Sequence, residues 1–153
     1  MTIGNMAAAV GKGLFAGVVG TGAMTISSTV EMKLRGREAS SAPVDAATKV
    51  LGLQPTGEDE KARLASIVHW GYGTAWGGVR GLVEVIGLRG LPAASAHLGM
   101  LWGTELIMLP KLEVVPPVKE WGARELAIDA LHHGVYAAAT SLTFAFLTRR
   151  SVR

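Results

Sequence analysis

The 153-residue chain contains no cysteine, and this absence removes several classes of site at once. Without thiols the chain has no disulfides, no thiolate metal ligands and no cysteine nucleophile. Charged residues are also scarce, at 18%, and the formal charge of +3 is too small and too dispersed along the chain to indicate a nucleic-acid partner. The length fits a single domain without a separate module.

Hydrolytic and nucleotide-binding motifs are missing as well. Ser27 and Ser28 do not lie in a nucleophile elbow, and nothing marks an oxyanion hole. The glycine-containing segment GTGAMT (20–25) lies inside an apolar run instead of following a strand, so it is not a phosphate-binding loop. The sequence therefore predicts no catalytic residue.

Apolar residues and glycine are abundant, with 49% hydrophobic residues and 20 glycines. Residues 13–30 carry no charge, and this length favours a membrane-spanning helix over a buried core helix. Three further segments reach the required length of about 20 residues only if ionisable groups are admitted. We therefore predict an all-α polytopic membrane protein, an antiparallel bundle of four transmembrane helices at residues 7–32, 63–86, 91–109 and 121–148.

Four crossings place both termini on the same side of a membrane, and the lipid bilayer is the expected partner. The chain is also expected to assemble as a homo-oligomer or within a larger membrane complex. Small residues at helical spacing predict close helix packing, namely Gly13 with Gly17 and the series Gly73, Gly77 and Gly81. The alternative is a soluble bundle whose interior is unusually rich in glycine.

The segment SAPVDAATKVLG (41–52) predicts a short amphipathic helix in the first loop. Ser41 is suited to the N-cap, Pro43 to the first turn and Asp45 to the positive end of the helix dipole, while Gly52 ends the helix. Its apolar face would lie on the membrane surface or under the bundle.

Ionisable residues interrupt the apolar helices in a regular pattern. At 100° per residue, Glu125, Asp129, His132 and Tyr136 fall on one stripe of the last helix. The second helix carries a similar stripe, which includes His69, Tyr72, Arg80 and Glu84. Within this stripe, Arg80 and Glu84 have the i,i+4 spacing that allows an ion pair. Because an ionisable group in lipid is costly unless it faces a partner, the stripes are expected to face one another.

Counting along each helix places ionisable groups of all four helices at one level. The candidates for proton relay or ion coordination are Glu31, His69, Glu105, Asp129, His132 and His133. Secondary polar contacts are expected at Tyr72, Arg80, Glu84, His97, Glu125 and Tyr136. Since adjacent residues cannot share one helix face, only one of His132 and His133 is expected to be central.

Several functions are compatible with such a cluster. It can be a hydrogen-bonded polar core that fixes helix register, or a pathway for protons or small ions, because histidine titrates near neutrality. A metal or haem site is a third interpretation by ligand type, although Asp129 and His132 form only one loose analogue of the Glu-x-x-His pairs in ferritin-like sites. An accessory subunit of a larger membrane complex is the alternative from another class.

The order and spacing of several motifs resemble the YagU-type family of small bacterial inner-membrane proteins. The resemblance begins in GLFAGVVGTGAMTISSTVEMKLRGREASSAPVD (13–45), with its Glu31, Arg37 and Pro43-Val44-Asp45. It continues through His69, Glu84, His97, Pro110, Pro116–Pro117, Glu125 and His133. It implies a multi-pass protein of the bacterial inner membrane with a loose link to acid survival, and it supplies no reaction. By position it supports Glu31, His69, His97, Glu125 and His133.

Overall fold

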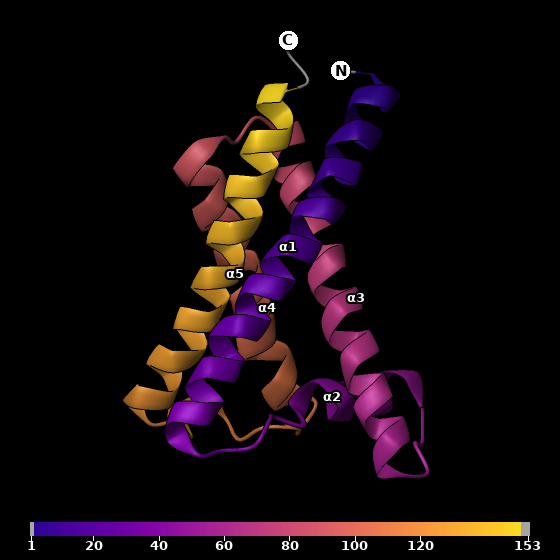
Figure 1. The fold of residues 1–153 in the computed structure, drawn as a ribbon, viewed down its shortest axis with the longest axis vertical. Helices are drawn as coiled ribbons and strands as arrows, with labels where there is room; N and C mark the ends of the chain where they lie inside the picture. The colour runs from indigo at the N-terminus through magenta and orange to yellow at the C-terminus, as the bar shows by residue number, and fades with distance from the viewer. Residues whose placement is uncertain (1, 151–153) are drawn as a thin grey trace.

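The chain folds into a bundle of four long helices with one short helix across its end (Figure 1). The structure is a computed structural model and describes residues 2–150. Its elements are α1 (Ile3–Arg35), α2 (Ala42–Leu51), α3 (Glu58–Val85), α4 (Gly90–Lys111), the 3-10 turn η1 (Val118–Glu120) and α5 (Ala123–Arg150). The start of α1 and the end of α5 lie at one end of the bundle, and α2 lies at the other, which we call the α2 end.

The all-helical prediction is confirmed, but the prediction of four membrane-spanning helices is wrong. Within residues 2–150, α1 is the one helix long and apolar enough to cross a membrane. The other long helices reach spanning length only when ionisable residues are counted as part of the span. Their histidines, glycines and charged side chains lower their mean hydropathy. Long-range packing, chiefly of α1 against α3 and α5, makes the chain a compact helical bundle. A multi-pass inner-membrane location loses its support.

Glycine brings the backbones of α1 and α3 into direct contact. A Cβ atom added at Gly17 would lie 2.8 Å from the carbonyl oxygen of Gly73 and 2.8 Å from the Cα of Gly77. Gly13 meets Gly77 and Gly81 in the same way. The predicted close packing of these glycines is confirmed, and it leaves no room for a side chain in this seam.

Helix α2 forms where local sequence chemistry predicts it. Pro43 occupies its first turn, and Gly52 ends it in the left-handed conformation at φ 66°. Ser41 is the N-cap residue, as predicted, although its side chain makes no capping hydrogen bond. Val44 is buried and Leu51 is 64% exposed, which places the apolar face only partly against the bundle.

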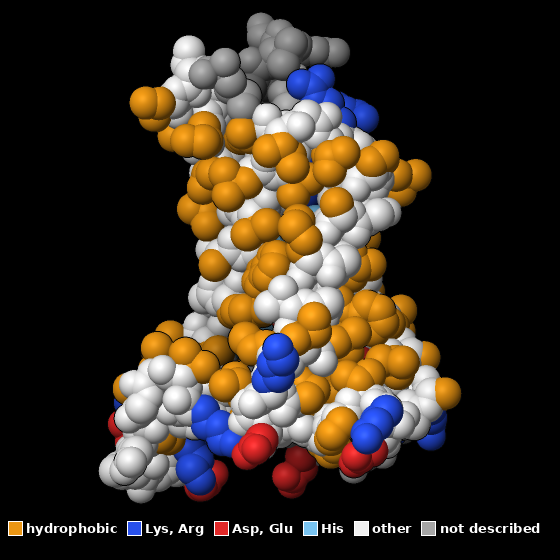
Figure 2. Space-filling view, turned by 180° about the vertical axis from the view of Figure 1, so that it is seen from behind, with side chains coloured by type: hydrophobic (Ala, Val, Ile, Leu, Met, Phe, Trp, Pro, Cys, Tyr) orange, Lys and Arg blue, Asp and Glu red, His pale blue; other side chains and the backbone are white. Residues whose placement is uncertain are grey.

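Polar groups are prominent in the interior of the bundle. The largest fully buried side chains are the apolar Phe144 and four that carry a polar group, namely Tyr136, His97, Thr21 and Thr140. Large apolar side chains lie outside on every long helix, for example Ile26 on α1 and Leu142 on α5, which is 73% exposed. Figure 2 shows apolar side chains over the waist of the bundle and charged side chains gathered mainly at one end. Monomeric soluble proteins rarely expose apolar surface of this extent.

Candidate functional site

His133 lies in the interior between α5 and α4, with 3% of its surface exposed. Its Nε2 is 2.8 Å from Oε2 of Glu105 on α4. On the other side of the ring, Nδ1 donates to the backbone carbonyl of Asp129 at 2.8 Å and lies 3.7 Å from the Asp129 carboxylate. The imidazole is thus held between a backbone carbonyl and a carboxylate.

This arrangement binds a proton. A carbonyl oxygen and an ionised carboxylate only accept hydrogen bonds, so both can be satisfied only by an imidazolium, or by a neutral imidazole beside a protonated Glu105. Burial opposes protonation of His133, but the hydrogen bond and the charge of Glu105, with a further contribution from Asp129, raise its pKa to about 9. The His133–Glu105 pair therefore holds one proton at neutral pH.

His132 points to the opposite side of α5, toward α1. Its Nδ1 is hydrogen-bonded to Ser27 Oγ at 2.8 Å, and its Nε2 lies 3.8 Å from Glu31 Oε2. Nε2 is buried and has no hydrogen-bond partner among the described residues. The expectation that only one of the adjacent histidines is central is wrong, because α5 packs between α1 and α4 and each neighbour receives one imidazole.

Two arginines hold the carboxylate of Glu31. Arg35 Nη1 donates to it at 2.8 Å from one turn further along α1. Arg37 Nε donates to both carboxylate oxygens at 2.9 and 3.0 Å from the chain that follows α1. Arg35 also pairs with Glu125 at the start of α5. These ion pairs fix the side of the cluster that lies nearest the α2 end.

We call Glu31, Glu105, Asp129, His132 and His133 the histidine–carboxylate cluster. With Arg35, Arg37 and Glu125, the four carboxylates face two guanidinium groups. Two negative charges are left without a fixed cation when both imidazoles are neutral. The proton held between His133 and Glu105 offsets one of them.

His69 lies beside this cluster without joining it directly. Its Nε2 is hydrogen-bonded to Thr25 Oγ1 on α1 at 2.9 Å. Burial lowers the pKa of His69, and the charge of Glu105 offsets part of this effect. His69 is therefore uncharged at neutral pH, and five of the six predicted relay residues make direct histidine–carboxylate contacts.

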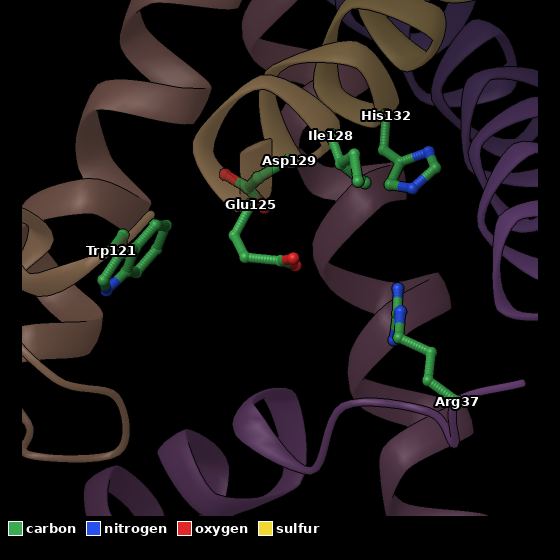
Figure 3. Close-up of a pocket in the computed structure, with 6 residues that line it drawn as sticks. All are labelled: Arg37, Trp121, Glu125, Ile128, Asp129 and His132. Atoms are coloured by element: carbon green, nitrogen blue, oxygen red, sulfur yellow. The ribbon is translucent and has the colours of Figure 1, made fainter. Parts of the chain in front are cut away.

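A pocket of about 210 Å³ leads to the cluster. It is lined by Arg37, Trp121, Glu125, Ile128, Asp129 and His132 (Figure 3). Trp121 and Arg37 stand on opposite walls, and the imidazole of His132 and the carboxylate of Glu125 face the space between them. Asp129 is fixed from behind by Trp102, whose Nε1 donates to its Oδ2 at 2.6 Å. The pocket gives His132 and Asp129 a route to the outside.

Among the secondary polar residues, Arg80, Glu84 and His97 make their contacts outside the cluster. Arg80 pairs with Glu84 at 3.4 Å, as the i,i+4 spacing predicts. His97 is fully buried, and its Nε2 donates to the backbone carbonyl of Trp76 at 2.9 Å. Burial lowers the pKa of His97 to about 4. The hydrogen bond to Trp76 raises this pKa, and the positive charge of Arg80 lowers it, but both effects are smaller than that of burial. The ring of Tyr72 packs edge-on against Trp76.

The described residues do not form a multidentate metal site. Residues 2–150 contain no group of three or more histidine, aspartate or glutamate side chains that could hold a metal ion. Asp129 and His132 do not meet a matching pair on another helix. The carboxylates of the cluster instead contact histidine and arginine side chains.

Several members of the site were missed in the sequence. Arg35 could have been found, because it lies at i,i+4 from Glu31 on the same helix. Ser27 and Trp102 contact the cluster from α1 and α4, and no local pattern marks them. Their roles depend on how the helices are rotated about their axes, which only the tertiary structure shows.

Comparison with protein-family profiles, curated proteins and solved structures finds no match to this chain. The resemblance to the YagU-type family therefore stays a prediction.

Proposed function

We propose that the protein binds and releases protons at the histidine–carboxylate cluster in response to pH. The observation that carries the proposal is the position of His133 between the Asp129 carbonyl and the Glu105 carboxylate. Because both neighbours are acceptors, a proton is part of this arrangement at neutral pH, and its loss would remove one of the two hydrogen bonds. A proton thereby controls how α4 and α5 are joined.

His132 connects the cluster to α1. Its Nδ1 is hydrogen-bonded to Ser27 Oγ, and its unpartnered Nε2 lies 3.8 Å from Glu31 Oε2.

We further propose that lipid covers the exposed apolar side chains, with α1 as the candidate membrane-crossing helix. At about 1.5 Å per residue, its 33 residues exceed the roughly 30 Å of a bilayer core. Phe15, Ile26 and Val30 of α1 are each more than half exposed. Cosedimentation with phospholipid vesicles tests this part, and recovery of the protein from the supernatant in alkaline carbonate would refute it.

Difference titration tests the proton-binding proposal. The purified wild type should bind one more proton than His133→Gln through the range between the ordinary histidine pKa of 6.5 and about 9. Glu58→Gln, a change at a side chain that is 89% exposed, serves as the control and should leave this difference unchanged. Identical titration curves for the wild type and His133→Gln would refute the proposal.

An accessory subunit of a larger membrane complex is the second candidate. It is favoured by the outer face of α4, where Met100 and Ile107 are 40% and 60% exposed. A partner helix would bury these side chains at a surface that the bundle leaves open. Copurification of one stoichiometric partner, lost in Ile107→Asn but kept in wild type, is the expected result, and a monodisperse single chain would refute this candidate.

A further inference from the structure

The pocket of Figure 3 contains a carboxylate that no lysine or arginine neutralises. Asp129 lines the pocket with a side chain that is 36% exposed, and its Oδ2 accepts from Trp102. Near its Oδ1 lies His133 Nδ1, at 3.7 Å, but this nitrogen donates to the backbone carbonyl of Asp129. Arg124 is exposed to solvent, and its charge acts on Glu125. Within residues 2–150, Asp129 therefore forms no ion pair with a fixed cation.

The other charges that border this pocket balance one another. Arg35 pairs with Glu31 and Glu125. Arg37 directs Nε and Nη2 to Glu31. Two guanidinium groups thus face two carboxylates, and Arg37 presents a neutralised wall to the pocket. The negative charge of Asp129 remains.

His132 supplies a second unsatisfied group at the same pocket. The residue is 6% exposed, its ring faces the space between the walls in Figure 3, and its Nε2 has no hydrogen-bond partner among the described residues. A protonated Nε2 would approach Glu31 to hydrogen-bond distance, yet the two groups stand 3.8 Å apart. This separation favours the tautomer in which Nδ1 donates to Ser27 and Nε2 presents a lone pair. The pocket therefore holds an acceptor that lacks a donor.

An aromatic wall completes the pocket. Trp121 is held in place by its Nε1, which donates to the backbone carbonyl of Pro116 at 2.9 Å. An indole ring attracts a cation placed over it, and the attraction is strongest for tryptophan among the aromatic side chains. The volume of about 210 Å³ is below the roughly 300 Å³ at which pockets for drug-sized ligands begin. These properties suit a small organic cation.

We infer that this pocket binds a small primary ammonium ion, which pairs with Asp129 and donates a hydrogen bond to Nε2 of His132. The two residues are three apart on α5, so their side chains are neighbours on one face of the helix. A primary ammonium has three N–H donors and can serve both, whereas a quaternary ammonium has no donor for the imidazole. The site goes beyond proton binding and does not depend on it, because the charge of Asp129 remains whether or not the His133–Glu105 pair holds a proton.

Two indole N–H groups report on this site in nitrogen-15 NMR of the full-length chain in detergent. Trp121 lines the pocket and Trp102 donates to Asp129, whereas Trp70 and Trp76 lie on α3 outside the pocket lining. Ethanolamine is the probe, propan-1-ol is the uncharged molecule of similar size, and choline is the cation without an N–H donor. Ethanolamine at millimolar concentration should shift the first two signals saturably and leave the other two in place. Choline should bind severalfold more weakly, and propan-1-ol should shift none of them.

Variants assign the binding to its two partners. Asp129→Asn keeps an acceptor for the tryptophan and removes the charge, so it should weaken ethanolamine binding severalfold. Glu120→Gln removes an exposed carboxylate beside Trp121 that does not line the pocket, and it should bind as wild type. His132→Phe should abolish the preference for ethanolamine over choline.

Three results would overturn the inference: no saturable shift with ethanolamine in the wild type, equal shifts with propan-1-ol, or a folded Asp129→Asn that binds as tightly as wild type. The first two concern the wild type and hold even if a variant fails to fold. Proton uptake by His133 is measured separately, so a failure here leaves the proposed function standing. Bicelles of phosphatidylethanolamine that block the ethanolamine shifts, where phosphatidylcholine does not, would identify a lipid headgroup as the source of the ammonium. Shifts unchanged in both would identify a free amine, and either result supports the site.

Discussion

The pH dependence of stability provides a quantitative test of the His133–Glu105 pair. The folded pKa of His133, about 9, is raised above the ordinary value of 6.5. A raised pKa stabilises the folded state fully below the unfolded pKa, and the stabilisation is lost as the pH rises through the folded pKa. At 1.36 kcal/mol per pKa unit, His133 contributes about 3 kcal/mol below pH 6.5 that disappears above pH 9.

The perturbation is His133→Gln, and the assay is urea unfolding followed by far-ultraviolet circular dichroism across this pH range. The free energy of unfolding of the wild type should exceed that of the variant most at the acid end. This difference should shrink by about 3 kcal/mol as the pH passes 9. Glu105→Gln should flatten the wild-type profile in the same way, because it removes the group that raises the pKa. A difference that is constant with pH, or that grows at alkaline pH, would refute this reasoning.

Two further substitutions test the packing and the arginine clamp. Gly17→Ala should lower the free energy of unfolding by roughly 1–3 kcal/mol, because the new methyl group meets backbone at 2.8 Å; Gly71→Ala, with open space around it, should instead be neutral or stabilising by up to about 1 kcal/mol. Equal effects in thermal unfolding would contradict the close contact. Glu31→Gln removes the carboxylate that pairs with Arg37 and one of the two that pair with Arg35, so it should lower the urea midpoint, whereas the exposed Glu38→Gln should leave the midpoint unchanged. Matching urea midpoints for these two variants would show that the clamp contributes nothing.

Local features of the fold were predictable because each depends on neighbours in the sequence. The start and end of α2 follow from Pro43 and Gly52, and the Arg80–Glu84 pair follows from helical spacing. The contact of the two helices through Gly17 and Gly77 follows from the absence of side chains at these positions.

The four-span architecture was not predictable from apolar length alone. The predicted spans contained ionisable residues such as His69, Arg80 and Asp129. Among the described helices, α1 alone is long and apolar enough to cross a membrane. Arg80 is buried and pairs with Glu84, as a buried charge requires, whereas the side chain of Asp129 is 36% exposed. The separate partners of His132 and His133 required the rotation of α5 between α1 and α4, which the sequence does not encode locally.

Nitrogen-15 NMR of the histidine rings tests most directly whether the cluster holds a proton, with the His133→Gln spectrum used for assignment. We expect both ring nitrogens of His133 to be protonated at neutral pH, with a transition near pH 9 that moves to lower pH in Glu105→Gln. A neutral His133 ring at pH 7 that titrates with the ordinary pKa of 6.5 in both proteins would contradict proton binding at the cluster.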